Sequence, residues 1–207
     1  YASPADRFGF QPFTPYEREL ARDILKSIAT FTYLTFTEVS DGETAYGQIR
    51  FGQNQQTGSI AYAYLPNSAN SQQDGDVYVN AGAITSQSDP AEDQALLTHE
   101  IFHALGLKHP GNYDGPNFSS SAAIGNFLGV DEDSMAYTTM SYRPAPQGQP
   151  SLGGVYDILT LRYLYGQRPV NTGDNIYSLT DDQGTALDTL IDDGGADTLD
   201  LGAISIA

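Results

Sequence analysis

The sequence predicts an α+β fold in which a twisted, mixed sheet packs with helices. Three observations predict it. Two stretches carry the capping residues of helices, four β-rich runs lie between them, and a third apolar stretch ends at a glycine. The chain has 207 residues, 40% of them hydrophobic, so it is long enough to bury a core.

The first predicted helix begins at residue 15. The sequence Thr14-Pro15-Tyr16-Glu17 combines an N-cap threonine, a first-turn proline and a glutamate placed to complete a capping box. Apolar residues then recur at helical spacing, at Leu20, Ile24, Leu25 and Ile28. This spacing predicts an amphipathic helix.

Four β-rich runs follow, each bounded by turn-forming residues. They are FTYLTFTEV (31–39), YGQIRFG (46–52), SIAYAYLP (59–66) and DVYVN (76–80). These runs predict strands of a mostly antiparallel or mixed sheet that packs on the first helix.

The second half of the chain is predicted to contain two helices and an irregular region. Asp89-Pro90-Ala91-Glu92 repeats the capping signature, and good helix formers continue until Gly106. Residues 107–152 are rich in Gly, Pro, Ser and Asn, which indicates irregular structure, and 154–166 predicts a third helix. Beyond residue 170 the composition changes to Asp, Gly, Thr and Leu. We therefore predict two domains, 1–170 and 171–207.

The charge and the cysteine count exclude several functions. Twenty-six acidic residues against nine basic ones give a formal charge of −17. This charge repels nucleic acid and anionic membranes and favours solubility and cation binding, so we expect no nucleic-acid or membrane partner. No apolar run reaches the roughly 20 residues that span a bilayer. There are no cysteines, so a metal site must use His and oxygen ligands.

All three histidines lie in the stretch LTHEIFHALGLKHP, residues 97–110. On a helix each residue turns about 100°, so His99 and His103 lie on one face, roughly 40° apart, with Glu100 beside them. Gly106 permits a sharp turn, after which His109 can return as a third ligand. Three imidazoles leave a fourth position for water, which is the layout of a catalytic rather than a structural zinc site.

This arrangement predicts metal-assisted amide hydrolysis. Zinc would lower the pKa of its bound water to about 7, and Glu100 would accept the proton and pass it to the leaving group. A bare HExxH pattern also arises by chance on exposed helices. Here the residues match the longer H-E-x-x-H-x-x-G-x-x-H spacing of metzincins, which favours an enzyme.

The chain resembles the serralysins, the secreted bacterial zinc endopeptidases of the metzincin group. The resemblance rests on Pro110 after the third histidine, on YTTMSY (137–142), which is similar to the serralysin Met-turn, and on the surrounding strand and helix runs. It implies that Met140 forms a hydrophobic floor beneath the imidazoles. It also implies that Tyr142 can ligate zinc and then stabilise the oxyanion.

The same resemblance implies a place for the substrate. In this interpretation SIAYAYLP is the edge strand of the sheet, where an extended substrate could add by β-augmentation. The residues concerned are Ala61, Tyr62, Ala63 and Tyr64. An ordinary sheet edge is the alternative.

The acidic tail resembles the start of a calcium-binding RTX repeat. DDGGAD (192–197) offers glycines for tight turns and oxygen ligands for Ca²⁺, and NTGDN (171–175) matches a serralysin R-T-G-D-T stretch with two departures. The resemblance implies calcium ligands at Asn171, Gly173, Asn175, Asp192, Gly194, Gly195 and Asp197. A plain Asp-Gly turn is the alternative for this single repeat.

Together these features predict a secreted, extracellular bacterial zinc endopeptidase that cleaves extended polypeptides and acts as a monomer. Its catalytic domain would span 1–170 with a lower irregular part that carries the Met-turn, and 171–207 would begin a truncated calcium-binding β-roll. The chain starts at Tyr1 without Met or a leader, so we expect a processed or trimmed chain. It would be either a fragment of a longer protein or a minimal variant.

Two other functional classes stay open at this point. The chain could be a calcium-stabilised metal-binding module without turnover. It could also be an amide hydrolase that acts on a non-protein or peptidoglycan substrate. A panel of denatured proteins and small amides separates this second alternative from an endopeptidase.

Overall fold

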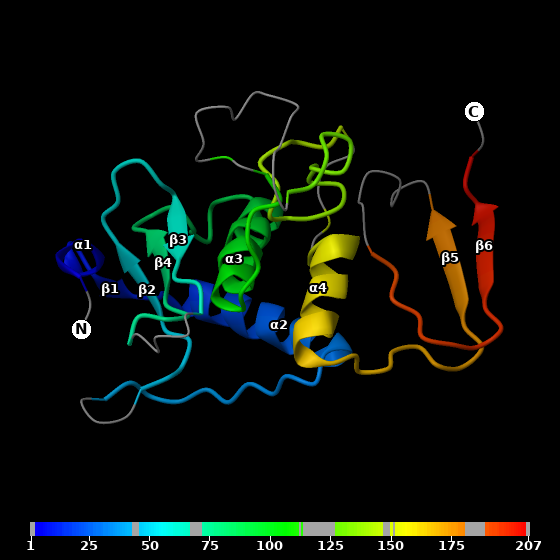
Figure 1. Cartoon of the computed structure of the whole chain (residues 1–207), viewed down its shortest axis with the longest axis horizontal. Helices are drawn as coiled ribbons and strands as arrows, with labels where there is room; N and C mark the ends of the chain where they lie inside the picture. The colour runs from blue at the N-terminus through cyan, green and yellow to red at the C-terminus, as the bar shows by residue number, and fades with distance from the viewer. Residues whose placement is uncertain are drawn as a thin grey trace. The chain divides into compact units, whose positions relative to one another are not determined.

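The computed structural model describes residues 3–42, 46–66, 72–111, 113, 127–146, 150, 152–180 and 189–205. Figure 1 shows the helices and strands of the chain, which contacts divide into two compact units. The first comprises Tyr1–Ser27 and Thr35–Lys108, and the second comprises Ile28–Leu34 and His109–Ala207. The fold is α+β with a mixed sheet and helices, as predicted.

The first unit contains a four-stranded sheet in the order β1-β2-β4-β3. Its strands are β1 (Gln11–Pro12), β2 (Phe51–Asn54), β3 (Ala61–Ala63) and β4 (Val77–Asn80). β2 and β4 are parallel, whereas β1 pairs with β2 and β3 pairs with β4 in antiparallel register. β3 therefore lies at the edge of the sheet (Figure 1).

Three helices form where the sequence predicts them. They are α2 (Pro15–Phe31), α3 (Pro90–Ala104) and α4 (Val155–Tyr165). At the start of α2 the N–H of Thr14 donates to the Glu17 carboxylate at 2.7 Å, and the N–H of Glu17 donates to the Thr14 hydroxyl at 3.3 Å. At the start of α3 the Asp89 side chain accepts from the N–H of Ala91 at 2.9 Å. These bonds are the capping interactions that the sequence signatures predict.

α3 packs on the sheet through contacts with β3 and β4. The completely buried apolar side chains of α3 and β4 are Leu97, Ile101, Phe102, Val77 and Val79. Burial of an apolar face fixes the rotation of a helix about its own axis. The core of the first unit therefore determines the direction in which His99 and His103 project.

The first β-rich run, 31–39, does not form the predicted strand. α2 continues to Phe31, and the Thr32 hydroxyl donates to the carbonyl of Ile28 at 2.8 Å. Thr32 forms an isolated antiparallel bridge with Gln167, and residues 34–40 carry no strand. Aromatic and β-branched residues form a strand only where another strand pairs with them. Here no strand of the described chain does so.

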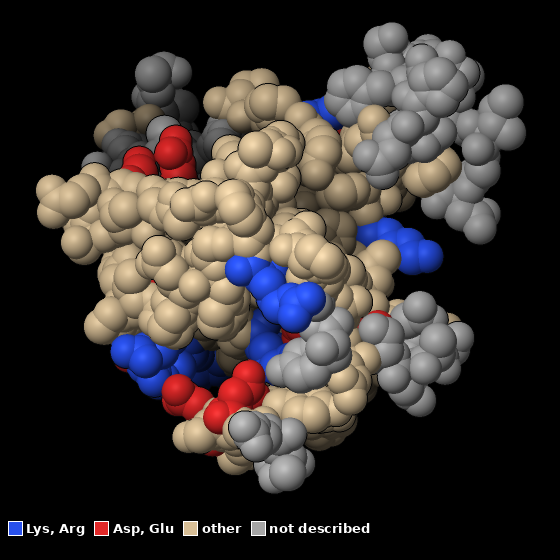
Figure 2. Space-filling view, turned by 90° about the vertical axis from the view of Figure 1, so that its left-hand side faces the viewer, with Lys and Arg blue, Asp and Glu red and all other residues tan. Residues whose placement is uncertain are grey.

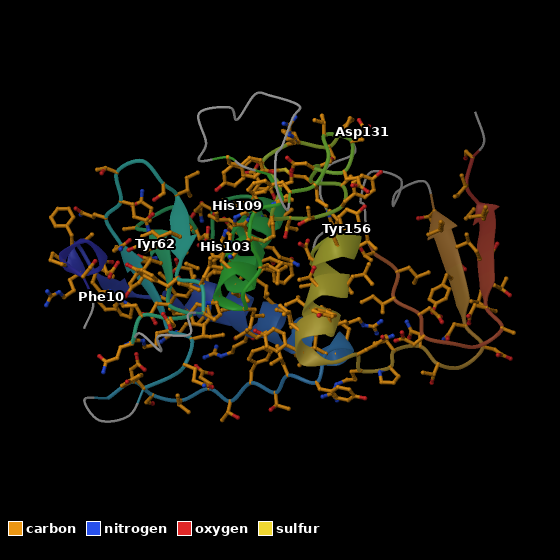
Figure 3. The ribbon with its side chains drawn as sticks, viewed as in Figure 1. Phe10, Tyr62, His103, His109, Asp131 and Tyr156 are labelled. Atoms are coloured by element: carbon orange, nitrogen blue, oxygen red, sulfur yellow. The ribbon has the colours of Figure 1, made fainter. Side chains whose placement is uncertain are left out.

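A short helix that the sequence analysis missed, α1 (Pro4–Arg7), ties the N-terminal segment to the sheet. Asp6 is 1% exposed and accepts hydrogen bonds from the phenols of Tyr62 and Tyr64 at 2.7 and 2.9 Å (Tyr62 is labelled in Figure 3). Burial raises the pKa of Asp6, but these phenols and Ser3 outweigh burial and lower it overall. Asp6 therefore anchors two side chains at the sheet edge.

The second unit combines α4 with a small sheet and irregular chain. β5 (Ile176–Thr180) and β6 (Thr198–Ala203) run parallel, with a register shift between Ser178 and Thr180. Residues 127–146 contain only turns, bends and unassigned backbone, in agreement with the predicted irregular region. The two-domain boundary near residue 170 and the β-roll stay predictions.

Arg162 on α4 connects three parts of the second unit. Its guanidinium donates to the carbonyl of Phe31 at 3.1 Å, to the carbonyl of Arg168 at 2.9 Å, and to both carboxylate oxygens of Asp193. Asp193 also accepts from the N–H of Val170 at 2.8 Å. This ion pair and these hydrogen bonds hold the pKa of Asp193 well below its usual range.

Charged side chains are sparse on one face of the molecule. Figure 2 views the end at which α1 lies, and most of that face is neither acidic nor basic. In the first unit Arg50 and Asp76 form a 2.6 Å ion pair that is almost fully buried. None of the helices formed by the described residues has the length and apolar character that crossing a bilayer requires.

Candidate metal centre

The structure brings the three histidines together. His99 and His103 lie one helical turn apart on α3, with ring centroids 4.7 Å apart. His109 follows on the same continuous segment, and the possible ligand nitrogens of all three lie within 4.8 Å of one another (His103 and His109 are labelled in Figure 3). In the part of the chain that is described, no other group of three His, Cys, Asp or Glu is placed to hold a metal ion.

The end of α3 determines how His103 is oriented. The N–H of Gly106 donates to the carbonyl of His103, and the N–H of Leu107 donates to that of Phe102, both at 2.9 Å, which is a Schellman turn. Gly106 has φ +98°, a conformation that favours glycine. The turn returns the Leu107 carbonyl to His103, whose Nδ1 lies 2.8 Å from it. A carbonyl only accepts, so Nδ1 carries the proton and Nε2 carries the lone pair that a metal needs.

The electrostatic surroundings suit a cation. Burial lowers the pKa of His103, more than the bond to Leu107 raises it, and so favours the neutral imidazole that a metal requires. Glu100 is 5% exposed, and burial raises its pKa to about 8. Its Oε2 is buried without a hydrogen-bond partner among the described residues. A cation nearby, or a water that donates a hydrogen bond, would satisfy this oxygen.

Tyr142 lies beside the third histidine. The ring centroids of Tyr142 and His109 are 4.6 Å apart. The Tyr142 side chain is half exposed, whereas Met140 and Ser141, which precede it, are buried. Zinc ligation by Tyr142 and the floor formed by Met140 stay predictions.

A buried carboxylate holds the turn that precedes Met140 against α4. The Asp157 carboxylate accepts from the Thr138 hydroxyl at 2.5 Å, from the N–H of Thr139 at 2.7 Å and from the N–H of Gly154 at 2.9 Å. Burial raises the pKa of Asp157, and the hydrogen bonds only partly oppose this effect. Asp157 of α4 therefore holds this turn in place, in addition to the hydrogen bonds within the turn itself.

Two residues near Tyr142, Tyr113 and Asp133, were not predicted from the sequence. Tyr113 stacks on the Tyr142 ring, with centroids 4.6 Å apart, and its phenol donates to the buried carboxylate of Asp133. Tyr113 follows Pro110-Gly111 by two positions, so its closeness to His109 could have been read as a local signal. Asp133 lies 20 residues further along the chain, and no spacing rule connects it to the site.

The edge strand has the position that the resemblance implies. β3 pairs with β4 on one side, and no strand of the described chain pairs with its other side. The relevant residues are Ala61, Tyr62, Ala63 and Tyr64. Substrate binding at this edge stays a prediction.

The two acidic-tail segments predicted to bind calcium lie side by side. The N–H of Asn175 donates to Asp197 and the N–H of Ala196 donates to Asp174, both at 2.8 Å. The Oδ1 of Asn175 is buried without a hydrogen-bond partner among the residues described. A Cβ added to Gly195 would overlap the carbonyl of Gly173, so the backbones approach closely.

Other residues predicted to bind calcium form hydrogen bonds in or next to the two acidic-tail segments. Asn171, with φ +52°, donates to the carbonyl of Ile191 at 2.9 Å, and Asp192 accepts from the N–H of Gly194 at 2.9 Å. Calcium binding by these residues stays a prediction.

Known proteins resemble the chain over most of its length. No family model matches it. Serralysin of Photorhabdus sp. (strain Az29) is 31% identical, covering 93% of this chain and 44% of that protein. Serralysin C of Dickeya chrysanthemi is 31% identical over 98% of this chain and 47% of that protein. Metallopeptidase AprA of Pseudomonas marginalis is 29% identical, covering 93% of this chain and 45% of that protein. The chain thus spans less than half the length of these relatives.

A solved structure agrees with the fold. A crystal structure of myroilysin is similar with a TM-score of 0.50 and 18% identity, covering 75% of this chain and 80% of that one. The myroilysin likeness shows the fold alone, whereas the similarity to the serralysins and the H-E-x-x-H-x-x-G-x-x-H spacing of residues 99–109 indicate a metzincin-type chain. Within that class the chain is a homologue of the serralysins, which confirms the resemblance that its motifs indicate.

Proposed function

We propose that this chain is the catalytic part of a secreted zinc endopeptidase that cleaves extended polypeptides. The observation that carries the proposal is the convergence of three imidazoles, two of them on a helix that also holds a buried carboxylate oxygen without a partner among the described residues. His99, His103 and His109 would hold the zinc. When bound, zinc polarises the peptide carbonyl and makes a water more acidic.

The chain's own groups would perform the proton transfers. Glu100 would accept the proton of the attacking water and deliver it to the departing amine. Its pKa of about 8 in the absence of metal would fall next to a cation, toward the neutral range that suits a general base. The Tyr142 phenol would donate a hydrogen bond to the oxyanion. Pairing with β3 would fix the substrate's register.

Glu100→Gln tests the general base. Gln keeps the shape of the side chain but cannot accept the proton, so the turnover number should fall by about 10²–10⁴-fold. One zinc per chain and the circular dichroism spectrum should be unchanged. Glu132→Gln, which changes an exposed acid, is the matched control. Unchanged turnover in Glu100→Gln would exclude Glu100 as the base.

The functional class is tested on the wild-type chain. Bound zinc and casein cleavage are measured on one sample, before and after a chelator and again after zinc is restored. Cleavage that disappears and returns supports the endopeptidase. Bound zinc without cleavage of any substrate would favour a binding module, and cleavage of small amides alone would favour the other hydrolase.

We propose in addition that the two acidic-tail segments bind Ca²⁺. The proposal rests on the buried oxygen of Asn175 and the close approach of Gly173 and Gly195. Calcium added at fixed zinc should raise the melting temperature, because a ligand that binds the folded state stabilises it. Asn175→Ala should weaken this calcium dependence, whereas Asp131→Ala, an exposed control, should not. No calcium dependence in the wild type would contradict the proposal.

A further inference from the structure

Tyr142 makes two simultaneous contacts with a second tyrosine of the same unit. The rings of Tyr113 and Tyr142 are stacked, with centroids 4.6 Å apart and planes 12° apart. The N–H of Tyr142 donates to the Tyr113 hydroxyl at 3.1 Å. One contact fixes the plane of the Tyr142 ring, and the other fixes its backbone.

Asp133 determines where the hydrogen of the Tyr113 phenol points. Asp133 is 4% exposed and accepts from the Tyr113 hydroxyl, from Ser141 Oγ at 2.7 Å and from Arg143 Nε at 3.0 Å. A phenol has one hydrogen and oxygen lone pairs that accept. When the hydrogen is donated to Asp133, the oxygen is left to accept from Tyr142.

Packing around this pair is close. Gly111 is buried, and a Cβ added there would overlap the Tyr113 ring and approach the Asp133 carboxylate. The Tyr113 ring centroid is 5.4 Å from that of His109, and that of Tyr142 is 4.6 Å from it. The rings of Tyr113, Tyr142 and His109, the third histidine, therefore form one cluster.

We propose that Tyr113, oriented by Asp133, is a positioning residue that holds Tyr142 beside His109. The inference rests on the proposed function, in which the Tyr142 phenol meets the oxyanion. Tyr142 is 50% exposed and lies in a region without helix or strand, so its own burial does not fix the phenol. A small misplacement of such a group lowers the turnover number more than substrate binding.

The positioning role of Tyr113 is tested by making Tyr113→Phe both in the wild-type chain and in a chain that carries Tyr142→Phe. Phe keeps the ring stack and removes only the hydroxyl. Loss of one ordinary hydrogen bond should lower kcat by about three- to tenfold, with KM within about twofold. In a Tyr142→Phe background the further fall should be under about twofold, because no phenol is left to position. Tyr156→Phe, which removes a phenol bonded to Glu132 at 3.1 Å, is the control (Figure 3).

A second measurement does not depend on activity. With copper(II) in place of zinc, phenolate-to-copper absorption should be lost in Tyr142→Phe and weakened in Tyr113→Phe. Equal losses of kcat in both backgrounds, or an unchanged kcat with unchanged absorption, would overturn the proposal. If Tyr113→Phe does not fold, Asp133→Asn replaces it with the same criteria. If the wild-type zinc protein cleaves no polypeptide, the proposed function fails, and the copper absorption still decides the positioning role.

Discussion

Replacing Asp157 with alanine should destabilise the second unit by a measurable amount. In the native chain this carboxylate is 1% exposed and accepts from the main-chain N–H groups of Thr139 and Gly154 at 2.7 and 2.9 Å. Alanine would leave both N–H groups buried without an acceptor. The turn before Met140 would also lose its connection to the first turn of α4.

The magnitude follows from these two donors. Each buried donor without a partner costs about 1–3 kcal/mol, so two would cost about 2–6 kcal/mol. The raised pKa of Asp157 shows that the carboxylate is itself costly to bury, and its removal recovers part of the loss. We therefore expect the free energy of unfolding to fall by about 2–4 kcal/mol.

Urea unfolding followed by circular dichroism measures this change, since the chain has no tryptophan to report by fluorescence. With an m-value of about 2 kcal/mol per molar, the midpoint should fall by about 1–2 M. Asp131→Ala, which changes an exposed acid of the same unit, should lie within about 0.5 kcal/mol of the wild type. If Asp157→Ala changes stability as little as this control does, the hydrogen bonds do not hold the turn.

Three further substitutions test other parts of the structure. Folding lowers the pKa of Asp6, so the ionised carboxylate stabilises the folded state at pH values above its usual pKa of about 3.9. This stabilisation is lost as the pH falls through the pKa of Asp6 in the folded state. Asp6→Asn should remove this acid dependence from unfolding curves, and an unchanged pH profile would contradict it. Gly195→Ala should weaken calcium-dependent stabilisation, because its Cβ would overlap the Gly173 carbonyl, and Gly202→Ala should weaken it less. Arg162→Lys should lower the melting temperature in thermal unfolding, since an ammonium cannot reproduce the fork that binds Asp193; an unchanged melting temperature would refute this.

Features that depend on neighbours in sequence were predictable. The helix turn between His99 and His103, the cap at Asp89 and the stop at Gly106 all involve residues within a few positions of one another. Helical geometry alone therefore fixes their relation. The edge position of β3 was correctly expected from the resemblance, not from the composition of the run.

Features that depend on distant partners were not predictable. The run 31–39 has the composition of a strand, but α2 extends into it and no described strand pairs with it. The bonds from Tyr113 to Asp133 and from Tyr62 to Asp6 join residues 20 and 56 positions apart. No periodicity connects such pairs. The missed α1 is different, because its Ser3 cap was readable, but the helix has only four residues.

The Schellman turn after α3 has a consequence for protein design. A designer who grafts only the H-E-x-x-H letters onto a surface helix would copy the two imidazoles and omit the carbonyl of Leu107 that selects the tautomer of His103. A portable element is the C-terminal half of α3 together with its glycine stop and His109, residues 97–109. A graft of that length would carry the third imidazole and the orienting carbonyl in a single peptide.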